Sequence, residues 1–126
     1  MSAEKRTVES VVLRFLARVM IADGTIDRRE VELLVQVAGT MHIDEDLARR
    51  IVDEEATTPS DPEALAREIA EPMHLRSVYA LGCLMAFAEE QIAPSEAAVL
   101  AAFARGAGIG DDEAAEILAD AQKKKE

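Results

Sequence analysis

The acidic side chains that could bind a metal ion are concentrated in two short segments. The first, ADGTIDRREVE from residue 22, matches the second half of a calcium-binding EF-hand loop through Asp23, Asp27 and Glu30. The first half does not match, because Val19 and Ile21 stand where that loop has acidic ligands. Since Ca²⁺ takes about six to eight oxygen ligands, this segment alone is not a standard EF-hand site.

The second acidic segment, AEEQIAPSEAA from residue 88, contains Glu89, Glu90 and Glu96. If the fold brings both segments together, their carboxylates supply the hard oxygen ligands that Mg²⁺, Ca²⁺ or Mn²⁺ prefers. A structural interpretation competes with this one. Glu30 and Glu96 stand where helix-capping carboxylates are common, and Asp23 stands in a turn. A divalent-cation site and helix caps without metal therefore both stay open.

No other group of residues has the spacing of a catalytic centre. His42 and His74 have no cysteine or second histidine at ligand spacing, and no serine or cysteine has an evident general base. The GAGIG segment at 106–110 lacks the strand and spacing of a dinucleotide-binding loop, so it is expected to end a helix. We expect Cys83 to be a buried inert thiol, and we expect the helical methionines to fill the core: Met20, Met41, Met73 and Met85. The sequence therefore predicts a protein that is not an enzyme and requires no cofactor.

The composition describes a small acidic protein whose core is aliphatic. Its 126 residues are 49% hydrophobic and only 3% aromatic, and this length fits a single domain covering 1–126. The formal net charge of −11 disfavours nucleic acid and anionic membrane surfaces as partners. The polar N-terminus and the short apolar run at 79–88 predict no signal peptide and no membrane insertion, so we expect a cytoplasmic protein.

The two acidic segments belong to an internal repeat with an offset of 66 residues. Residues 22–51 align without a gap on residues 88–117, and identical residues include Glu30 with Glu96 and Ile43 with Ile109. We therefore expect two pseudo-twofold-related repeats joined by a linker helix, with boundaries at about 8–56, about 61–71 and about 73–122.

Helix signals within these units predict an all-α, compact bundle of about seven helices. In the first repeat an apolar helix is followed by one that starts at a capping box, Asp27 with Glu30, and by a third that starts near Asp44. The second repeat has an apolar helix over 78–88, then helices starting at Pro94 and near Asp111. Ser60 or Asp61 caps the linker helix, which should end near Pro72. An alanine-rich face permits close helix contact within or between chains: Ala97, Ala98, Ala101 and Ala102.

The doubled ADGxIxxxE pattern resembles the TerB-type tellurite-resistance domain. It is complete from Ala22 to Glu30 and degenerate from Ala88 to Glu96, and the likeness covers about residues 11–118. The same module is similar to the N-terminal region of membrane-anchored DnaJ-type co-chaperones. The resemblance implies a bacterial, cytoplasmic helical bundle with a metal-binding acidic patch. That patch maps to Asp23, Asp27, Glu30, Glu89, Glu90 and Glu96, although Glu90 and Ala93 depart from the pattern in the second copy.

Together these observations predict a non-enzymatic TerB-like module that binds another protein, and a divalent cation through its acidic segments, in a tellurite or stress-response context. One alternative is a purely structural adaptor without metal. A further alternative is a metal-assisted hydrolase, which would need a polar cleft with an open coordination position.

Overall fold

The computed structural model describes residues 7–22, 26–69, 71–87 and 92–125 of the chain. These ranges contain seven α-helices and no strand, so the prediction of an all-α bundle is confirmed. In chain order the helices are α1 (Val8–Met20), α2 (Arg28–Thr40), α3 (Glu45–Thr57), α4 (Pro62–Arg67), α5 (Pro72–Phe87), α6 (Pro94–Ala107) and α7 (Asp111–Lys125).

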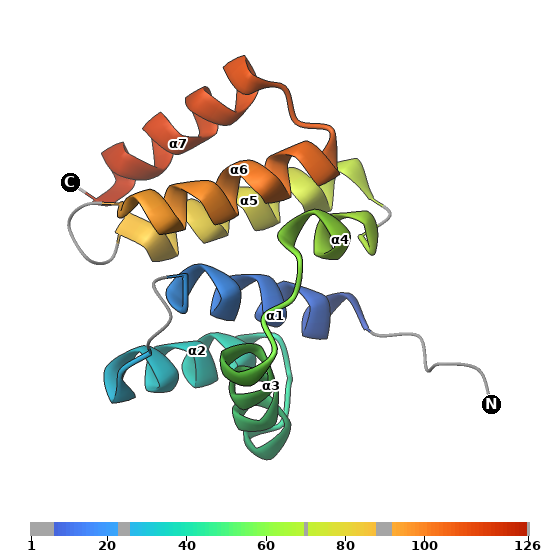
Figure 1. The fold of residues 1–126 in the computed structure, drawn as a ribbon, viewed down its shortest axis with the longest axis vertical. Coiled ribbons are helices and arrows are strands. Elements are labelled where there is room, and N and C mark those ends of the chain that lie inside the picture. The colour runs from blue at the N-terminus through green and yellow to red at the C-terminus, as the bar shows by residue number, and fades with distance from the viewer. Residues whose placement is uncertain (1–6, 23–25, 70, 88–91, 126) are drawn as a thin grey trace.

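Helix α1 lies at the centre of the bundle (Figure 1). It contacts α2 and α3 on one side and α4, α5 and α6 on the other. Helix α4 packs against α6, and α7 packs against α5. The central position of α1 follows from its sequence, because apolar residues occupy most of its circumference and must be covered by other helices.

The centre of the core is a pair of stacked aromatic rings from helices far apart in the chain. The rings of Phe15 in α1 and Phe103 in α6 have centroids 4.0 Å apart and an interplanar angle of 24°. Gly82 in α5 leaves the space that the Phe15 ring occupies, since a Cβ atom there would lie 2.6 Å from that ring. Burial of each large apolar side chain in such a core stabilises the fold by roughly 1.5 to 3 kcal/mol.

Acidic side chains begin the second and third helices as predicted. The backbone N–H of Glu30 donates to Asp27 Oδ1 at 2.8 Å, and the N–H of Asp27 donates to Glu30 Oε1 at 3.0 Å, which confirms the capping box. Asp44 accepts from the N–H of Asp46 at 3.1 Å. These contacts satisfy backbone donors that the first turn of a helix leaves unpaired.

The linker helix is capped by Asp61, one of the two predicted caps, and differs from the prediction at its C-terminal end. Helix α4 ends at Arg67 instead of continuing to near Pro72. Pro72 is the first residue of α5, where its missing N–H costs no helical hydrogen bond. Helix α5 therefore begins six residues before the expected apolar run at 78–88.

The early start of α5 changes the position of one predicted core residue. Met20 and Met85 are buried as expected, and Met41 is partly buried against the core. Met73, however, is 80% exposed, so its assignment as core filler was wrong. The reason is that Met73 lies in the first turn of α5, on a part of the helix that no other described element covers.

The helix-ending roles predicted from glycine are confirmed. Gly108 follows α6 with a positive φ of 74°, and the N–H of Ile109 donates to the carbonyl oxygen of Ala104 at 3.0 Å.

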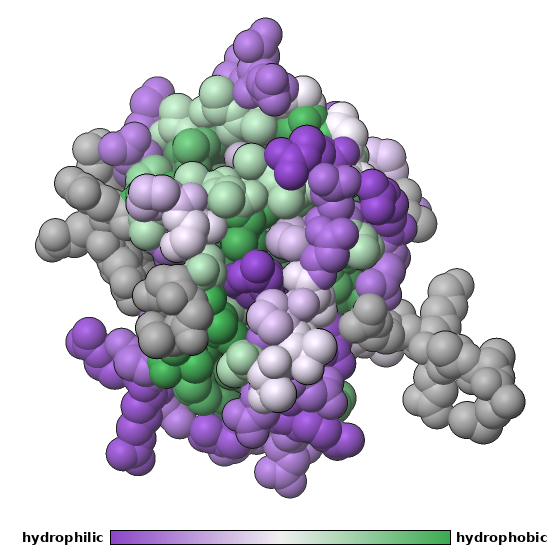
Figure 2. Space-filling model, viewed as in Figure 1, coloured by the Kyte–Doolittle hydropathy of each residue, from purple (hydrophilic) through white to green (hydrophobic). Residues whose placement is uncertain are grey.

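Figure 2 shows pale-green residues over α6, whose alanine-rich face is largely exposed at Ala97, Ala98 and Ala101. No helix of the described ranges is long and apolar enough to cross a membrane.

Candidate functional site

An apolar groove lies between α1, α5 and the C-terminal end of α2. Its volume is about 430 Å³, and it is lined by five apolar and three polar side chains: Val8, Val12, Met41, Val78, Leu81, Glu9, His74 and Ser77. The side chain of Val8 is apolar, yet the residue is 41% exposed. Exposed hydrophobic residues that cluster in a concave surface are typical of sites that bind another molecule.

Helix α5 supplies one long wall of this groove. Ser77 and Leu81 are four residues apart, and Met73 precedes Ser77 by the same interval, so all three lie on one face of the helix. Because Met73 is 80% exposed, it extends the hydrophobic surface by one turn beyond the groove. The start of α5 at Pro72 is what places Met73 and His74 on this helix face.

Helices α1 and α2 form the opposite wall. Thr7 caps α1 by accepting from the N–H of Ser10 at 3.2 Å, and this start places Val8 and Val12 one turn apart on the same face. Met41 enters the groove directly after α2. There the chain turns through His42, which has a positive φ of 63°.

Two ionisable side chains are among the residues that line the groove, Glu9 and His74. Two arginines of the same helices are engaged elsewhere. Arg76 donates to Glu113 of α7, with Nη2 and Oε1 3.1 Å apart, and Arg14 is held by glutamates of α3. The hydrogen bond from Arg76 lowers the pKa of the Glu113 carboxyl below its ordinary value.

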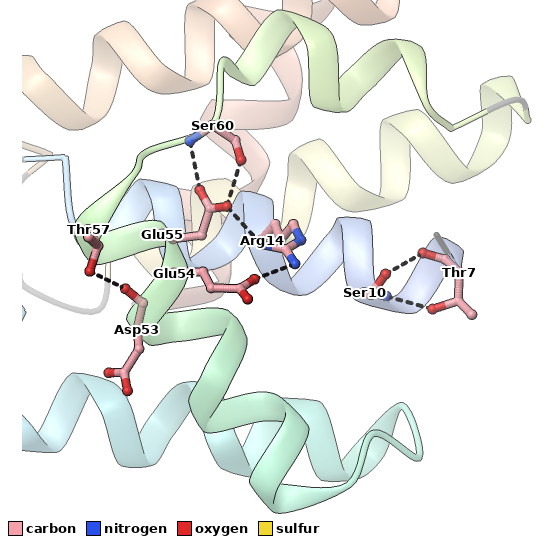
Figure 3. A network of polar contacts seen from close by, with 8 residues as sticks. All are labelled: Thr7, Ser10, Arg14, Asp53, Glu54, Glu55, Thr57 and Ser60. Atoms are coloured by element: carbon pink, nitrogen blue, oxygen red, sulfur yellow. Dashed lines mark hydrogen bonds and ion pairs between the residues drawn. The ribbon is translucent and has the colours of Figure 1, made fainter. Parts of the chain in front are cut away.

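A network of polar contacts joins α1 to α3 and to the connection before α4 (Figure 3). Arg14 donates to Glu54 Oε1 at 2.7 Å and to Glu55 Oε2 at 3.2 Å. Glu55, which is 1% exposed, also accepts from the N–H of Ser60 at 2.9 Å and from its hydroxyl at 2.6 Å. Arg18 donates from Nε to the carbonyl oxygen of Ser60 at 3.1 Å.

This network borders a wide polar cavity of about 590 Å³, to which Arg50, Asp53 and Thr57 also contribute. Both glutamates are already bound to Arg14, and the buried carboxylate of Glu55 accepts three hydrogen bonds. Burial of a polar group costs free energy unless the group is hydrogen-bonded. The arrangement therefore accounts for the network as a structural connection between helices.

The residues predicted to bind a cation fall into two groups. Asp23, Glu89 and Glu90 lie outside the described residues. Asp27 and Glu30 form the capping box of α2, and Glu96 Oε1 accepts from the N–H of Ala93 at 2.9 Å at the start of α6. Within the ranges that the structure describes, no three side chains of His, Cys, Asp or Glu are grouped so that they could hold a metal ion. The cation site stays a prediction, because half of its residues are not among those described.

One described residue of each acidic segment lines the same cavity. Ala22, which directly precedes Asp23, and Ser95, which directly precedes Glu96, line one cavity of about 290 Å³. Arg18 and Pro62 also line it. The ends of the two segments therefore lie on the same side of the bundle, between α1, α4 and α6.

A comparison with family models identifies one family that matches this chain. The family described as "Protein of unknown function (DUF533)" matches residues 1–124. The chain belongs to this family. DUF533 is part of the TerB-like clan, which agrees at that level with the resemblance in the acidic segments. Comparisons with curated proteins and with solved structures found no match.

Sequence reasoning did not identify the groove of this DUF533 chain. It treated Met73 as core and gave Val8, His74 and Leu81 no role. A usable signal was present, because Met73, Ser77 and Leu81 recur every four residues. That signal is informative only if α5 begins at Pro72, whereas the proline was interpreted as the end of the preceding helix.

The single cysteine is placed as predicted. Cys83 is fully buried in α5, and burial raises the pKa of its thiol to about 11. Because the thiolate is the reactive form of cysteine, both burial and the raised pKa oppose reaction at neutral pH.

Proposed function

We propose that this chain is a non-enzymatic protein-interaction module that binds an apolar segment of another protein in the groove between α1, α5 and the end of α2. The observation that carries the proposal is the apolar lining of this groove together with the exposure of Val8 and Met73. Exposed apolar side chains do not stabilise the domain on its own. A partner that covers them removes their surface from water, and this favours binding. Met41 and Met73 add flexible, polarizable contacts of the kind that adapt to a bound side chain.

Membership of the TerB-like clan supports the biological setting of the proposal. We place the module in a tellurite or stress response of a bacterial cell, where it acts by contact with another protein and not by catalysis. Similarity to the clan is what supports this setting, and proteins that share one fold can have unrelated roles.

Site-specific photo-crosslinking in cells tests the interaction. A photo-reactive amino acid replaces Ser77, an exposed residue of the groove, and in a matched variant it replaces Ala97, an exposed residue of α6. The proposal expects a discrete crosslinked species from position 77 that is absent from position 97. No adduct at position 77, or the same adducts from both positions, contradicts it.

A divalent-cation site between the two acidic segments is a second proposal. It is supported by the cavity that Ala22 and Ser95 both line, because one residue of each acidic segment lies there. The site would use Asp23, Asp27, Glu30, Glu89, Glu90 and Glu96 as oxygen ligands for Ca²⁺, Mg²⁺ or Mn²⁺.

Thermal melting of chelator-treated protein, with and without each cation, tests this second proposal. A cation at 100 times its dissociation constant stabilises the fold by roughly 2.7 kcal/mol. Glu30→Gln keeps an oxygen that can accept from Asp27 but removes a charge, so it should abolish the shift. Glu116→Gln on the exposed face of α7 is the control. An unchanged melt of the parent protein favours the purely structural adaptor.

A further inference from the structure

We propose that helix α7 is a detachable cover of α5. It separates from α5 as one unit while α1 to α6 stay folded, and this opening uncovers apolar side chains of α5. The inference concerns a movement built into the fold and does not depend on the partner proposed above, because none of the described residues that line the groove belongs to α7.

Helix α3 provides a matched reference for α7. Both helices follow a helix that ends in a left-handed turn, at His42 before α3 and at Gly108 before α7. With the sequence offset of 66 residues, the inward-facing positions of α3 correspond one by one to those of α7: Ala48 with Ala114, Ile51 with Ile117, Val52 with Leu118 and Glu55 with Ala121. The same four positions can therefore be compared in the two helices.

The matched positions are covered less completely in α7 than in α3. In α3 all four residues are buried, with exposed fractions of 2% or less. In α7 Ala121 is 3% exposed, while Ala114, Ile117 and Leu118 are only partly buried. Because hydrophobic stabilisation grows with the apolar surface removed from water, α7 is held to the bundle more weakly than α3.

The difference follows from the neighbours of each helix. Helix α3 packs against both α1 and α2, whereas α7 lies at an outer edge of the bundle and packs mainly against α5 (Figure 1). A cavity of about 130 Å³ interrupts the contact between α5 and α7. It is lined by side chains of both helices: Ala80, Leu84, Ile117, Asp120, Ala121 and Lys124. Unfilled space of this kind forfeits part of the dispersion attraction between facing side chains.

Polar contacts also hold α3 more firmly than α7. Arg14 of α1 and Ser60 both donate to the buried carboxylate of Glu55 in α3. Among the described residues, one ion pair joins α7 to another helix, that of Arg76 with Glu113, whose side chains are 44% and 40% exposed. Exposed ion pairs contribute little stability because water and salt screen them. This pair therefore positions α7 on α5 without preventing its release.

The chain before α7 shows where the movement occurs. Ile109 is 5% exposed, and its N–H donates to the carbonyl oxygen of Ala104 at 3.0 Å, so the chain is held to α6 up to this residue. Gly110 is exposed, and α7 begins at the next residue. Backbone rotation at Gly110 therefore displaces α7 without disturbing α6. Release uncovers Ala80 and Leu84, so α7 controls whether another molecule can reach this surface of α5.

Hydrogen exchange of the native full chain, followed by NMR at low urea concentrations, tests the inference. The amide protection factors of Ile117 and Leu118 should be at least about tenfold lower than those of Ile51 and Val52, the matched residues of α3. The N–H of Ala114 donates to the carbonyl oxygen of Gly110 at 2.9 Å, so it is protected only while the first turn of α7 is intact. Because α7 opens as a unit, the three α7 amides should share one dependence on urea.

Two other results would each overturn the inference. Equal protection at the matched positions of α3 and α7 would mean that both exchange only when the whole protein unfolds. Protection that falls steadily from Ala114 toward the C-terminal end of α7, without dependence on urea, would mean that the helix frays and does not detach as a unit.

Two variants separate the release of α7 from global unfolding. Glu55→Ala weakens the contact of α3 with α1, which the open state of α7 retains. It should lower the protection of Ile51 and Val52 by about fivefold or more and leave that of α7 within about twofold of the parent. Arg76→Gln removes the ion pair with Glu113 and should lower the protection throughout α7 by about twofold or more. An equal fall in α3 and α7 caused by Glu55→Ala, or unchanged α7 protection in Arg76→Gln, would contradict the proposal.

Discussion

His42 and Gly108 hold the same left-handed backbone conformation at the ends of α2 and α6, with φ values of 63° and 74°. The hydrogen bonds around them also correspond. The N–H of Ile43 donates to the carbonyl oxygen of Ala38 at 3.0 Å, and the N–H of Ile109 donates to that of Ala104 at 3.0 Å. Both are helix-ending turns of the kind in which glycine is the favoured residue.

His42→Gly should therefore stabilise the protein. A non-glycine residue in this conformation costs roughly 1 to 2 kcal/mol, and the extra flexibility of glycine in the unfolded chain offsets part of the gain. We expect the free energy of unfolding, measured with urea, to rise by roughly 0.5 to 1 kcal/mol. Gln36→Gly, in the exposed middle of α2, is the control and should lower it by up to about 1 kcal/mol. A destabilised His42→Gly variant would mean that the histidine side chain makes a stabilising contact.

Gly106→Ala should destabilise the contact between α4 and α6. A Cβ atom at Gly106 would lie 2.4 Å from the carbonyl oxygen of Glu63, and this backbone atom cannot move without displacing α4. Overpacking of this kind costs typically about 1 to 3 kcal/mol, which urea unfolding can resolve. Gly39→Ala in α2 meets no atom within 4 Å and should stabilise by up to about 1 kcal/mol. Equal stability of the two variants would rule out so close an approach of α4 to α6.

Local signals are the reason that most helix starts could be predicted from the sequence. The capping box of Asp27 with Glu30 and the proline at position 94 act within one turn, so their effect does not depend on the rest of the fold. Pro72 is the contrary case. A proline is compatible with the first turn of one helix and with the end of another, and only the packing of α5 on α1 and α7 selects between them.

The groove and the buried network could not be predicted in the same way, because they combine elements that are distant in sequence. Glu54 and Glu55 are neighbours with the same side chain, yet one is 50% exposed and the other 1% exposed. Both accept from Arg14, about 40 residues earlier in the chain, but only Glu55 also accepts from the backbone N–H and the hydroxyl of Ser60. The groove likewise requires α1, α2 and α5 to be placed before its lining can be recognised.

Truncation of these two glutamates should have unequal effects. Glu55→Ala removes a buried carboxylate that accepts from Arg14 and Ser60, and the loss of this acceptor for buried donors costs roughly 1 to 3 kcal/mol. Glu54→Ala removes a half-exposed partner of the same arginine and should cost less than about 1 kcal/mol. Chemical unfolding of both variants provides the measurement. If the two losses are similar, Glu55 is not the centre of the network.

The ion pair between α5 and α7 should contribute stability that depends on pH. The hydrogen bond from Arg76 lowers the pKa of the Glu113 carboxyl in the folded state. A carboxyl whose pKa falls on folding contributes stability that is present above its unfolded pKa and is lost as the pH falls through its folded pKa.

Arg76→Gln should therefore lower the free energy of unfolding most at neutral pH, and the difference from the parent should shrink as the pH falls below about 4.3, the ordinary pKa of glutamate. The side chains of Arg76 and Glu113 are 44% and 40% exposed, so added salt should also reduce the difference. Arg29→Gln, an exposed arginine at the start of α2, removes the same charge from the acidic chain without touching α7. Thermal melts of the parent and the two variants from pH 3 to pH 7 measure the effect. A difference for Arg76→Gln that does not change with pH, or that Arg29→Gln reproduces, would show that Glu113 does not fix α7 to α5 through this pair.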